Sequence, residues 1–138
     1  MPFSEIALRV VLAFAGAFVV ATGIDFAVGG IASLGIEGPR DFFTVTNQHA
    51  FEVRDNHTRF IGGVWLGVGL VLLTAAVWLK ALKPALLACI VLIFIGGIAR
   101  FSAQRIDLVL GPEIVGSLIA ELVGMPVLFL WVWHAHKH

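Results

Sequence analysis

The chain has 138 residues, of which 59% are hydrophobic and 13% are charged, and its formal net charge at pH 7 is zero. Soluble domains carry about a quarter charged residues, so the composition excludes an ordinary soluble domain. A neutral chain also lacks the basic face that nucleic-acid binding needs. The single cysteine, Cys89, lies inside an apolar run and is interpreted as a packing residue. The length suits one membrane domain, residues 1–138.

Four apolar segments are each about 20 residues long, enough to cross a hydrocarbon core roughly 30 Å thick. The apolar run near the N-terminus continues too far for a signal peptide and is interpreted as the first span. Pro126 removes a backbone hydrogen bond and predicts a kink in the last span. The spans are predicted at residues 5–28, 58–79, 84–104 and 112–133, with a long outer loop at 29–57. This pattern predicts an all-α fold, an integral membrane four-helix bundle.

Local signals place the ends of these helices. Ser4 is a predicted N-cap of the first helix, and the pair Gly29-Gly30 ends it. Asn47 is expected to cap a short helix in the outer loop, which leads towards the second span. Pro84 and Pro112 suit the first turns of the third and fourth helices.

Small residues predict two surfaces for close helix packing. Ala13, Ala17 and Ala21 recur every four residues on the first span. Gly63 and Gly67 form a Gly-x-x-x-Gly motif on the second. Such surfaces let the backbones of neighbouring membrane helices approach one another.

Four spans place both termini on the same side of the membrane. Arg59 and Arg100 are discounted from the charge comparison because they are expected to pair inside the bundle. The excess of basic residues then lies on the terminal side, which is predicted to be cytoplasmic. The basic residues on that side are Arg9, Lys80, Lys83 and Lys137.

Four charged residues of the predicted spans qualify as intramembrane residues that need partners: Asp25, Arg59, Arg100 and Glu121. Each costs about 2.5–3.5 kcal/mol at a span centre, so such residues face the bundle interior and seek partners. The third and fourth spans form a hairpin, which makes Arg100 and Glu121 the expected pair.

These residues define a candidate ligand-binding site: Arg59, Arg100 and Glu121, with Asp55 on the face of Arg59 and Trp65 further along the same helix. One interpretation is a buried ion-pair network that sets the helix register. The other is an outer-side polar pocket for a lipid-like or anionic ligand or a partner protein, in a binding or accessory protein that is not an enzyme. The alternative function is a membrane enzyme or carrier for a quinone or lipid, with Glu121 as proton donor or acceptor. A second copy of the chain is a further possible partner.

His49, Glu52, Asp55 and His57 offer metal-ligand chemistry within a short stretch. They lack a zinc spacing such as His-Glu-x-x-His, so no metal site is predicted. Histidines 134, 136 and 138 are interpreted as a C-terminal tail with adventitious metal affinity. No motif for a cofactor is present.

The motifs Arg59-Phe60-x-Gly62, Gly67-x-Gly69, Gly96-Gly97-x-x-Arg100 and Glu121-Leu122 resemble those of a bacterial family of small four-span membrane proteins catalogued as a domain of unknown function. That family is similar in build to DoxX-like proteins. The resemblance extends from Ile6 to about Leu130 and implies a four-helix membrane bundle in the bacterial inner (cytoplasmic) membrane. It implies no known activity, and the long first loop has no clear counterpart in the family.

Overall fold

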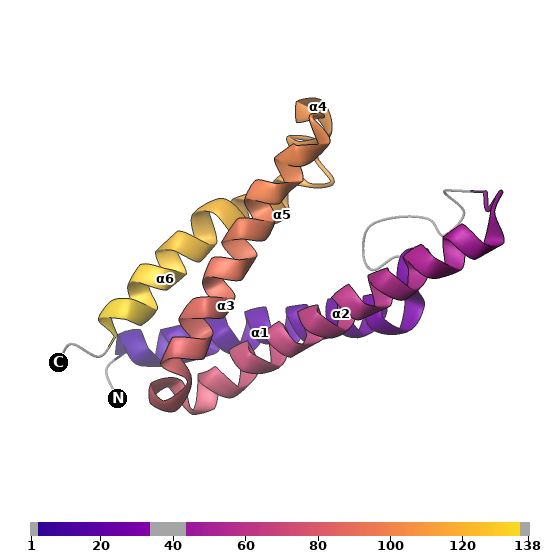
Figure 1. Cartoon of the computed structure of the whole chain (residues 1–138). Helices are drawn as coiled ribbons and strands as arrows, with labels where there is room; N and C mark the ends of the chain where they lie inside the picture. The colour runs from indigo at the N-terminus through magenta and orange to yellow at the C-terminus, as the bar shows by residue number, and fades with distance from the viewer. Residues whose placement is uncertain (1–2, 34–43, 136–138) are drawn as a thin grey trace. The chain divides into compact units, whose positions relative to one another are not determined.

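The computed structural model describes residues 3–33 and 44–135, and every regular element in these ranges is helical (Figure 1). Four helical segments are long and apolar enough to cross a membrane: Phe3–Ala32, Gln48–Val77, Leu79–Ala103 and Val115–His134. The predicted all-α class with four spans is therefore confirmed. The elements are α1 (Phe3–Gly29), the 3-10 turn η1 (Gly30–Ala32), α2 (Gln48–Val77), α3 (Leu79–Ala99), the 3-10 turn η2 (Arg100–Ala103), α4 (Ile106–Val109), α5 (Val115–Ile119), the π-helical turn η3 (Ala120–Gly124) and α6 (Met125–His134).

The second helix begins well before the predicted span. The backbone N–H of Ala50 donates to Asn47 Oδ1 at 3.0 Å, so Asn47 is an N-cap as predicted. The expected short helix after Asn47 is not separate, however, because α2 runs without interruption from Gln48 to Val77. The predicted loop at 29–57 therefore ends at Asn47, and its residues 34–43 lie outside the described part.

Three other predicted helix ends are wrong. Ser4 lies inside α1, where its Oγ accepts a hydrogen bond from Trp131 Nε1 at 2.9 Å. The helix α3 starts at Leu79 and contains Pro84, because burial of Leu79 extends the packed face of the helix by a turn. The fourth span begins at Val115, since residues 111–114 form a turn closed by hydrogen bonds to the Gly111 carbonyl.

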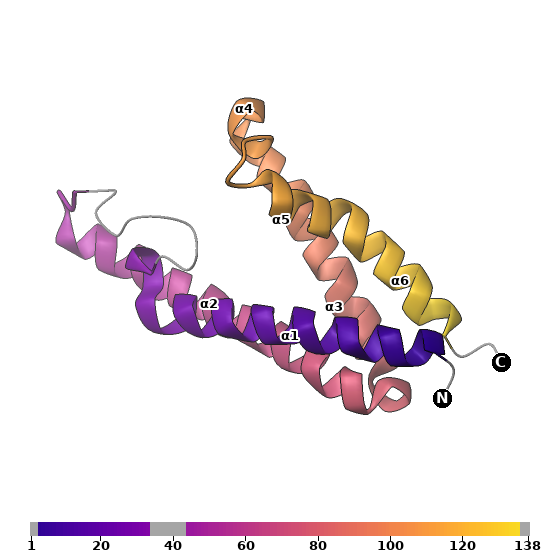
Figure 2. The ribbon, with the colours of Figure 1, turned by 180° about the vertical axis from the view of Figure 1, so that it is seen from behind.

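The described chain divides into two compact units, and each is described by itself. In the unit formed by residues 11–74, α1 and α2 run side by side in opposite directions (Figures 1 and 2). A glycine on one helix faces a larger residue on the other, and the side that supplies the glycine alternates along the seam. The successive close approaches are Gly62 to Ala27, Gly23 to Leu66, Gly69 to Val20 and Gly16 to Leu73.

These positions recur at intervals of four, three and four residues on both helices, which is the spacing of one continuous helix face. The seam corrects the predicted packing surfaces. A Cβ at Gly63 or Gly67 would meet no described atom within 4 Å, and Ala17 and Ala21 are exposed. The glycines that allow close approach are therefore not those of the Gly-x-x-x-Gly motif.

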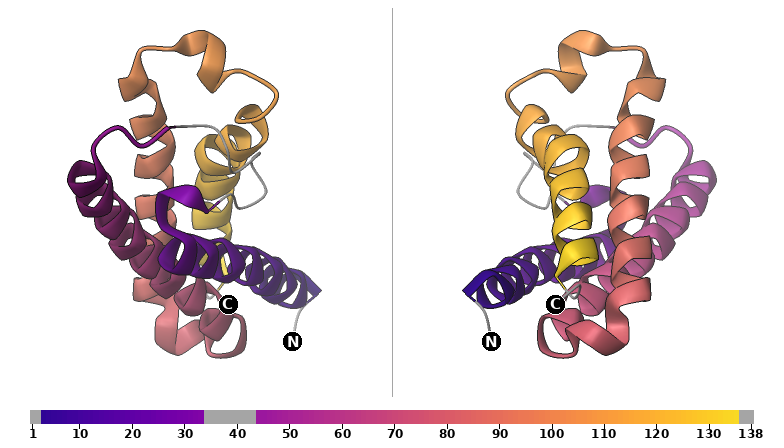
Figure 3. Two further views of the ribbon diagram at one scale, coloured as in Figure 1. Left: turned by 90° about the vertical axis from the view of Figure 1, so that its right-hand side faces the viewer. Right: turned by 90° about the vertical axis from the view of Figure 1, so that its left-hand side faces the viewer.

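The other unit contains residues 75–138 together with the first ten residues, and in it α3 packs against η3 and α6 (Figure 3). Its most deeply buried side chains are Leu8, Leu79, Leu86, Ile90 and Val132. The last span leaves α-geometry in η3, directly before Pro126, which is where the proline predicts a disturbance.

Large apolar side chains remain exposed on all four spans, as helices that face lipid require. Examples are Phe14 on α1, Phe60 on α2, Leu92 on α3 and Val127 on α6. The domain organisation and the side on which the termini lie stay predictions.

Candidate functional site

Arg100 and Glu121 form a two-point ion pair between the third and fourth spans. Arg100 Nε donates to Glu121 Oε2 at 2.7 Å, and Nη2 donates to Oε1 at 2.6 Å. The predicted pairing of these residues is confirmed. The glutamate is the better covered partner, since its side chain is 15% exposed and that of Arg100 is 34% exposed. Parallel hydrogen bonds of this kind are among the strongest polar contacts in proteins.

The backbone at both ends of this pair departs from α-geometry. Arg100 is the first residue of the 3-10 turn η2, and Glu121 lies in the π-helical turn η3. Gly97, one turn before Arg100, is buried, and a Cβ there would stand 2.8 Å from Glu121 Cβ and 2.9 Å from Leu122 Cδ2. The glycine therefore lets η3 approach α3 closely enough for the two side chains to meet. π-helical turns inside α-helices are frequent at functional positions.

Asp55 and Arg59 join the end of α1 to α2 in the other unit. Asp55 Oδ1 accepts a hydrogen bond from the Ile31 N–H at 2.8 Å, and Oδ2 accepts one from Arg59 Nε at 2.6 Å. Arg59 Nη1 also donates to the carbonyl of Val28. Gly30, at φ +65°, is needed here because a Cβ would stand 1.9 Å from Asp55 Oδ1. These contacts satisfy polar backbone groups at the C-terminal end of α1.

Trp65 makes a second polar link between the same helices. Its Nε1 donates to Thr22 Oγ1 at 2.9 Å. The contact gives the indole N–H of this half-buried tryptophan a partner within the span. Ligand roles for Trp65, Asp55 and Arg59 stay predictions. The predicted pocket would combine Arg59 with Arg100 and Glu121, which belong to different units, and it also stays a prediction.

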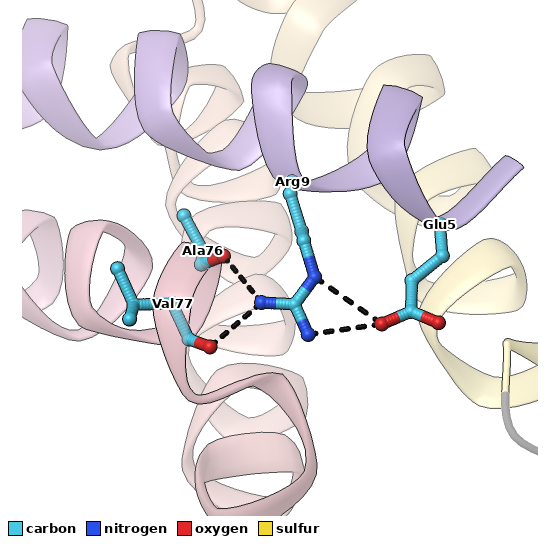
Figure 4. Close-up of polar contacts among 4 residues, drawn as sticks. All are labelled: Glu5, Arg9, Ala76 and Val77. Carbon is cyan, nitrogen blue, oxygen red and sulfur yellow. Dashed lines mark hydrogen bonds and ion pairs between the residues drawn. The ribbon is translucent and has the colours of Figure 1, made fainter. Parts of the chain in front are cut away.

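Arg9 has a role that the sequence analysis missed. Its Nη1 donates to the carbonyls of Ala76 and Val77, at 2.7 and 2.6 Å, and these are the last carbonyls of α2 (Figure 4). Nε and Nη2 bond to Glu5 Oε1 at 3.2 and 2.9 Å. Arg9 therefore caps the C-terminus of a neighbouring helix, as Arg59 does for α1. The acid-x-x-x-Arg spacing that these two arginines share predicts the ion pair within each helix, because it places both side chains on one helix face, but it does not show which carbonyls the arginines cap.

The remaining intramembrane acid, Asp25, differs from the others. Its Oδ2 is buried and has no hydrogen-bond partner among the described residues. No group of three or more potential metal ligands is found in the part of the chain that the structure describes. His49 and His57 are exposed on α2, and His136 and His138 lie outside the described residues.

One further ion pair lies outside the spans, within the connection that leads from the third span to the fourth. Arg105 Nη2 and Nε donate to the two carboxylate oxygens of Asp107, at 2.5 and 2.9 Å. The hydrogen bond from Arg105 holds the pKa of Asp107 below its ordinary value. Both side chains are about two-thirds exposed, at 64% and 67%. Water screens this pair, so it contributes little to stability.

The comparisons with known proteins bear on the family alone. No curated protein and no solved structure matches the chain. One protein-family model matches residues 7–132 and is described as a domain of unknown function, DUF4345. The match includes the second and third spans and most of the first and fourth, with the Arg100–Glu121 pair and the α1–α2 seam. The chain therefore belongs to the DUF4345 family, whose member here has four helices long and apolar enough to cross a membrane.

Proposed function

We propose that this protein is a non-catalytic, multi-pass protein of the bacterial inner membrane, DoxX-like in build, that binds a lipid-like ligand with an anionic head. The binding residue in this proposal is Arg100, and Glu121 is the ion-pair partner with which the ligand competes for it. The observation that carries the proposal is an intramembrane ion pair built on a π-helical turn, with a third of its arginine exposed.

A purely structural pair would be expected to bury both partners. Here Glu121 is well covered, whereas Arg100 keeps 34% of its side chain exposed at the end of a span. A guanidinium keeps its positive charge at all physiological pH values and matches the oxygen geometry of carboxylates and phosphates. The exposed part of Arg100 therefore presents positive charge to such a group at the edge of the membrane.

Native mass spectrometry with oleate, an amphiphile with one carboxylate, tests this proposal. Arg100→Gln is expected to weaken oleate binding about tenfold or more, since a hydrogen bond to a charged group contributes about 1.5–3 kcal/mol. Glu121→Gln is expected to strengthen binding, because Glu121 competes with the ligand for Arg100. Arg105→Gln is the matched control, because it breaks an exposed arginine–carboxylate pair outside the spans.

The proposal fails if Arg100→Gln and Arg105→Gln bind oleate equally well. It also fails if Glu121→Gln lowers oleate affinity as much as Arg100→Gln does, since the pair would then only maintain the fold. Thermal unfolding of each variant in the same detergent separates loss of binding from loss of structure.

A membrane carrier or enzyme acting on a quinone or lipid is the second candidate, with Glu121 as proton donor or acceptor. The π-helical turn favours it, because a change from π- to α-geometry would rotate Glu121 away from Arg100. Infrared difference spectroscopy on addition of a short-chain quinone provides the test. A protonated-carboxyl band that appears with quinone and is absent in Glu121→Gln would support the carrier, and a carboxylate unchanged by quinone would rule it out.

A further inference from the structure

We propose that the connection between α2 and α3 binds the phosphate headgroup of an anionic phospholipid. A hollow of about 260 Å³ lies at this connection. Its lining residues are Arg9, Val77, Trp78, Leu79, Lys80 and Ala81. The site is separate from the proposed function, because no residue in this lining takes part in the Arg100–Glu121 pair.

The two basic side chains in the lining, Arg9 and Lys80, differ in whether an acidic group already pairs with them. Arg9 is compensated by Glu5 and already donates to two backbone carbonyls, so it forms a rigid wall of the hollow. Lys80 is exposed, and no acidic group pairs with it among the described residues. The positive charge available to a ligand is therefore that of Lys80. The Trp78 side chain, 62% exposed, lies beside it.

The position of the hollow indicates a lipid. One membrane-spanning helix ends at Val77 and the next begins at Leu79, so Trp78 and Lys80 lie where a span meets the headgroup layer. Tryptophan and lysine are the side chains enriched at that depth, and basic pockets beside span ends bind anionic headgroups. Val77, Leu79 and Ala81 give the hollow apolar walls, which free phosphate would not use. A phospholipid can place its phosphate at Lys80 and its glycerol and first acyl carbons against those walls.

Lys83 is a matched control on the same helix. It does not line the hollow, and its Nζ donates to the Trp133 carbonyl at 2.9 Å. If charge near the membrane surface were all that mattered, removing Lys83 would weaken binding as much as removing Lys80. If the hollow is a binding site, removing Lys80 should weaken binding and removing Lys83 should not.

The experiment titrates short-chain phosphatidylglycerol onto the full-length protein in neutral detergent and follows binding by native mass spectrometry. Lys80→Gln is expected to weaken binding about fivefold, the effect of one basic side chain near an anionic lipid. Lys80→Arg should retain binding, and Lys83→Gln should change it less than about twofold. Phosphatidylcholine and glycerol phosphate are the comparison ligands, and both should bind more weakly than phosphatidylglycerol.

Equal losses in Lys80→Gln and Lys83→Gln would overturn the proposal in favour of general surface charge. No loss in Lys80→Gln would also overturn it. Equal affinity for glycerol phosphate and phosphatidylglycerol would show a phosphate site in place of a lipid site. Arg100→Gln should leave this binding unchanged, and Lys80→Gln should leave the Arg100-dependent oleate binding unchanged, so the two proposals can fail independently.

Discussion

Replacing Gly62 with alanine should destabilise the α1–α2 hairpin, whereas the same change at the adjacent Gly63 should not. A methyl group at Gly62 would stand 2.4 Å from the Ala27 backbone nitrogen and 2.6 Å from the Phe26 carbonyl carbon. Backbone atoms cannot rotate away, so α1 would have to move until ordinary contact distances are restored. A methyl group at Gly63 would meet no described atom within 4 Å.

The expected difference in free energy of unfolding follows from two opposing effects. Overpacking a closely packed position costs about 1–3 kcal/mol. Replacing glycine by alanine inside a helix gains about 1 kcal/mol, because the unfolded chain loses less freedom on folding. Gly62→Ala should therefore lose up to about 2 kcal/mol, and Gly63→Ala should gain up to about 1 kcal/mol.

Unfolding both variants with sodium dodecyl sulfate in mixed micelles, followed by tryptophan fluorescence, measures this difference. Trp65 lies on α2 and bonds to Thr22 on α1, so one of the four tryptophans that contribute to the emission lies at the seam. Equal stability of the two variants would refute the seam, and so would a Gly62→Ala protein more stable than Gly63→Ala.

Two further predictions concern the other unit. Gly97→Ala should destabilise the protein by about 1 kcal/mol and Gly96→Ala should not, because only the first would push against Glu121 and Leu122; chemical denaturation checks this, and similar values would contradict the packing. Asp107 should titrate below its ordinary pKa, so its small stabilising contribution should be present above that ordinary value and be lost as the pH falls through the lowered pKa. Carboxyl NMR of wild type and Arg105→Gln tests this, and an unchanged Asp107 titration would refute the pairing.

Hydropathy and helix-capping signals in the sequence predict much of the fold. Spans of about 20 apolar residues predicted four membrane helices, and the capping residue Asn47 was correctly identified. The predicted start of α3 is wrong. The sequence places Pro84 in the first turn of the helix, whereas α3 begins at Leu79. Leu79 is buried, so tertiary packing favours a helical turn before the proline. Local propensity contains no information about that packing.

Part of the candidate site is also predictable from the sequence. A charged residue in a span needs a partner, and hairpin topology left Glu121 as the nearest acid to Arg100. The capping role of Arg9 depends on where α2 ends in space, and no spacing within one helix shows that. The choice of packing glycines, Gly62 in place of Gly63, depends on which face of α2 meets α1.

The amino-acid sequence by itself determined the class of molecule, four apolar helices for a membrane, because hydrophobic length and charge cost act on each segment separately. It also determined that Arg100 needs an acidic partner. Only the tertiary structure decided which glycines bring helices together, which carbonyls the arginines cap, and that Glu121 meets Arg100 from a π-helical turn. These features depend on the rotation and register of one helix against another, and the packing energies of many side chains together set both.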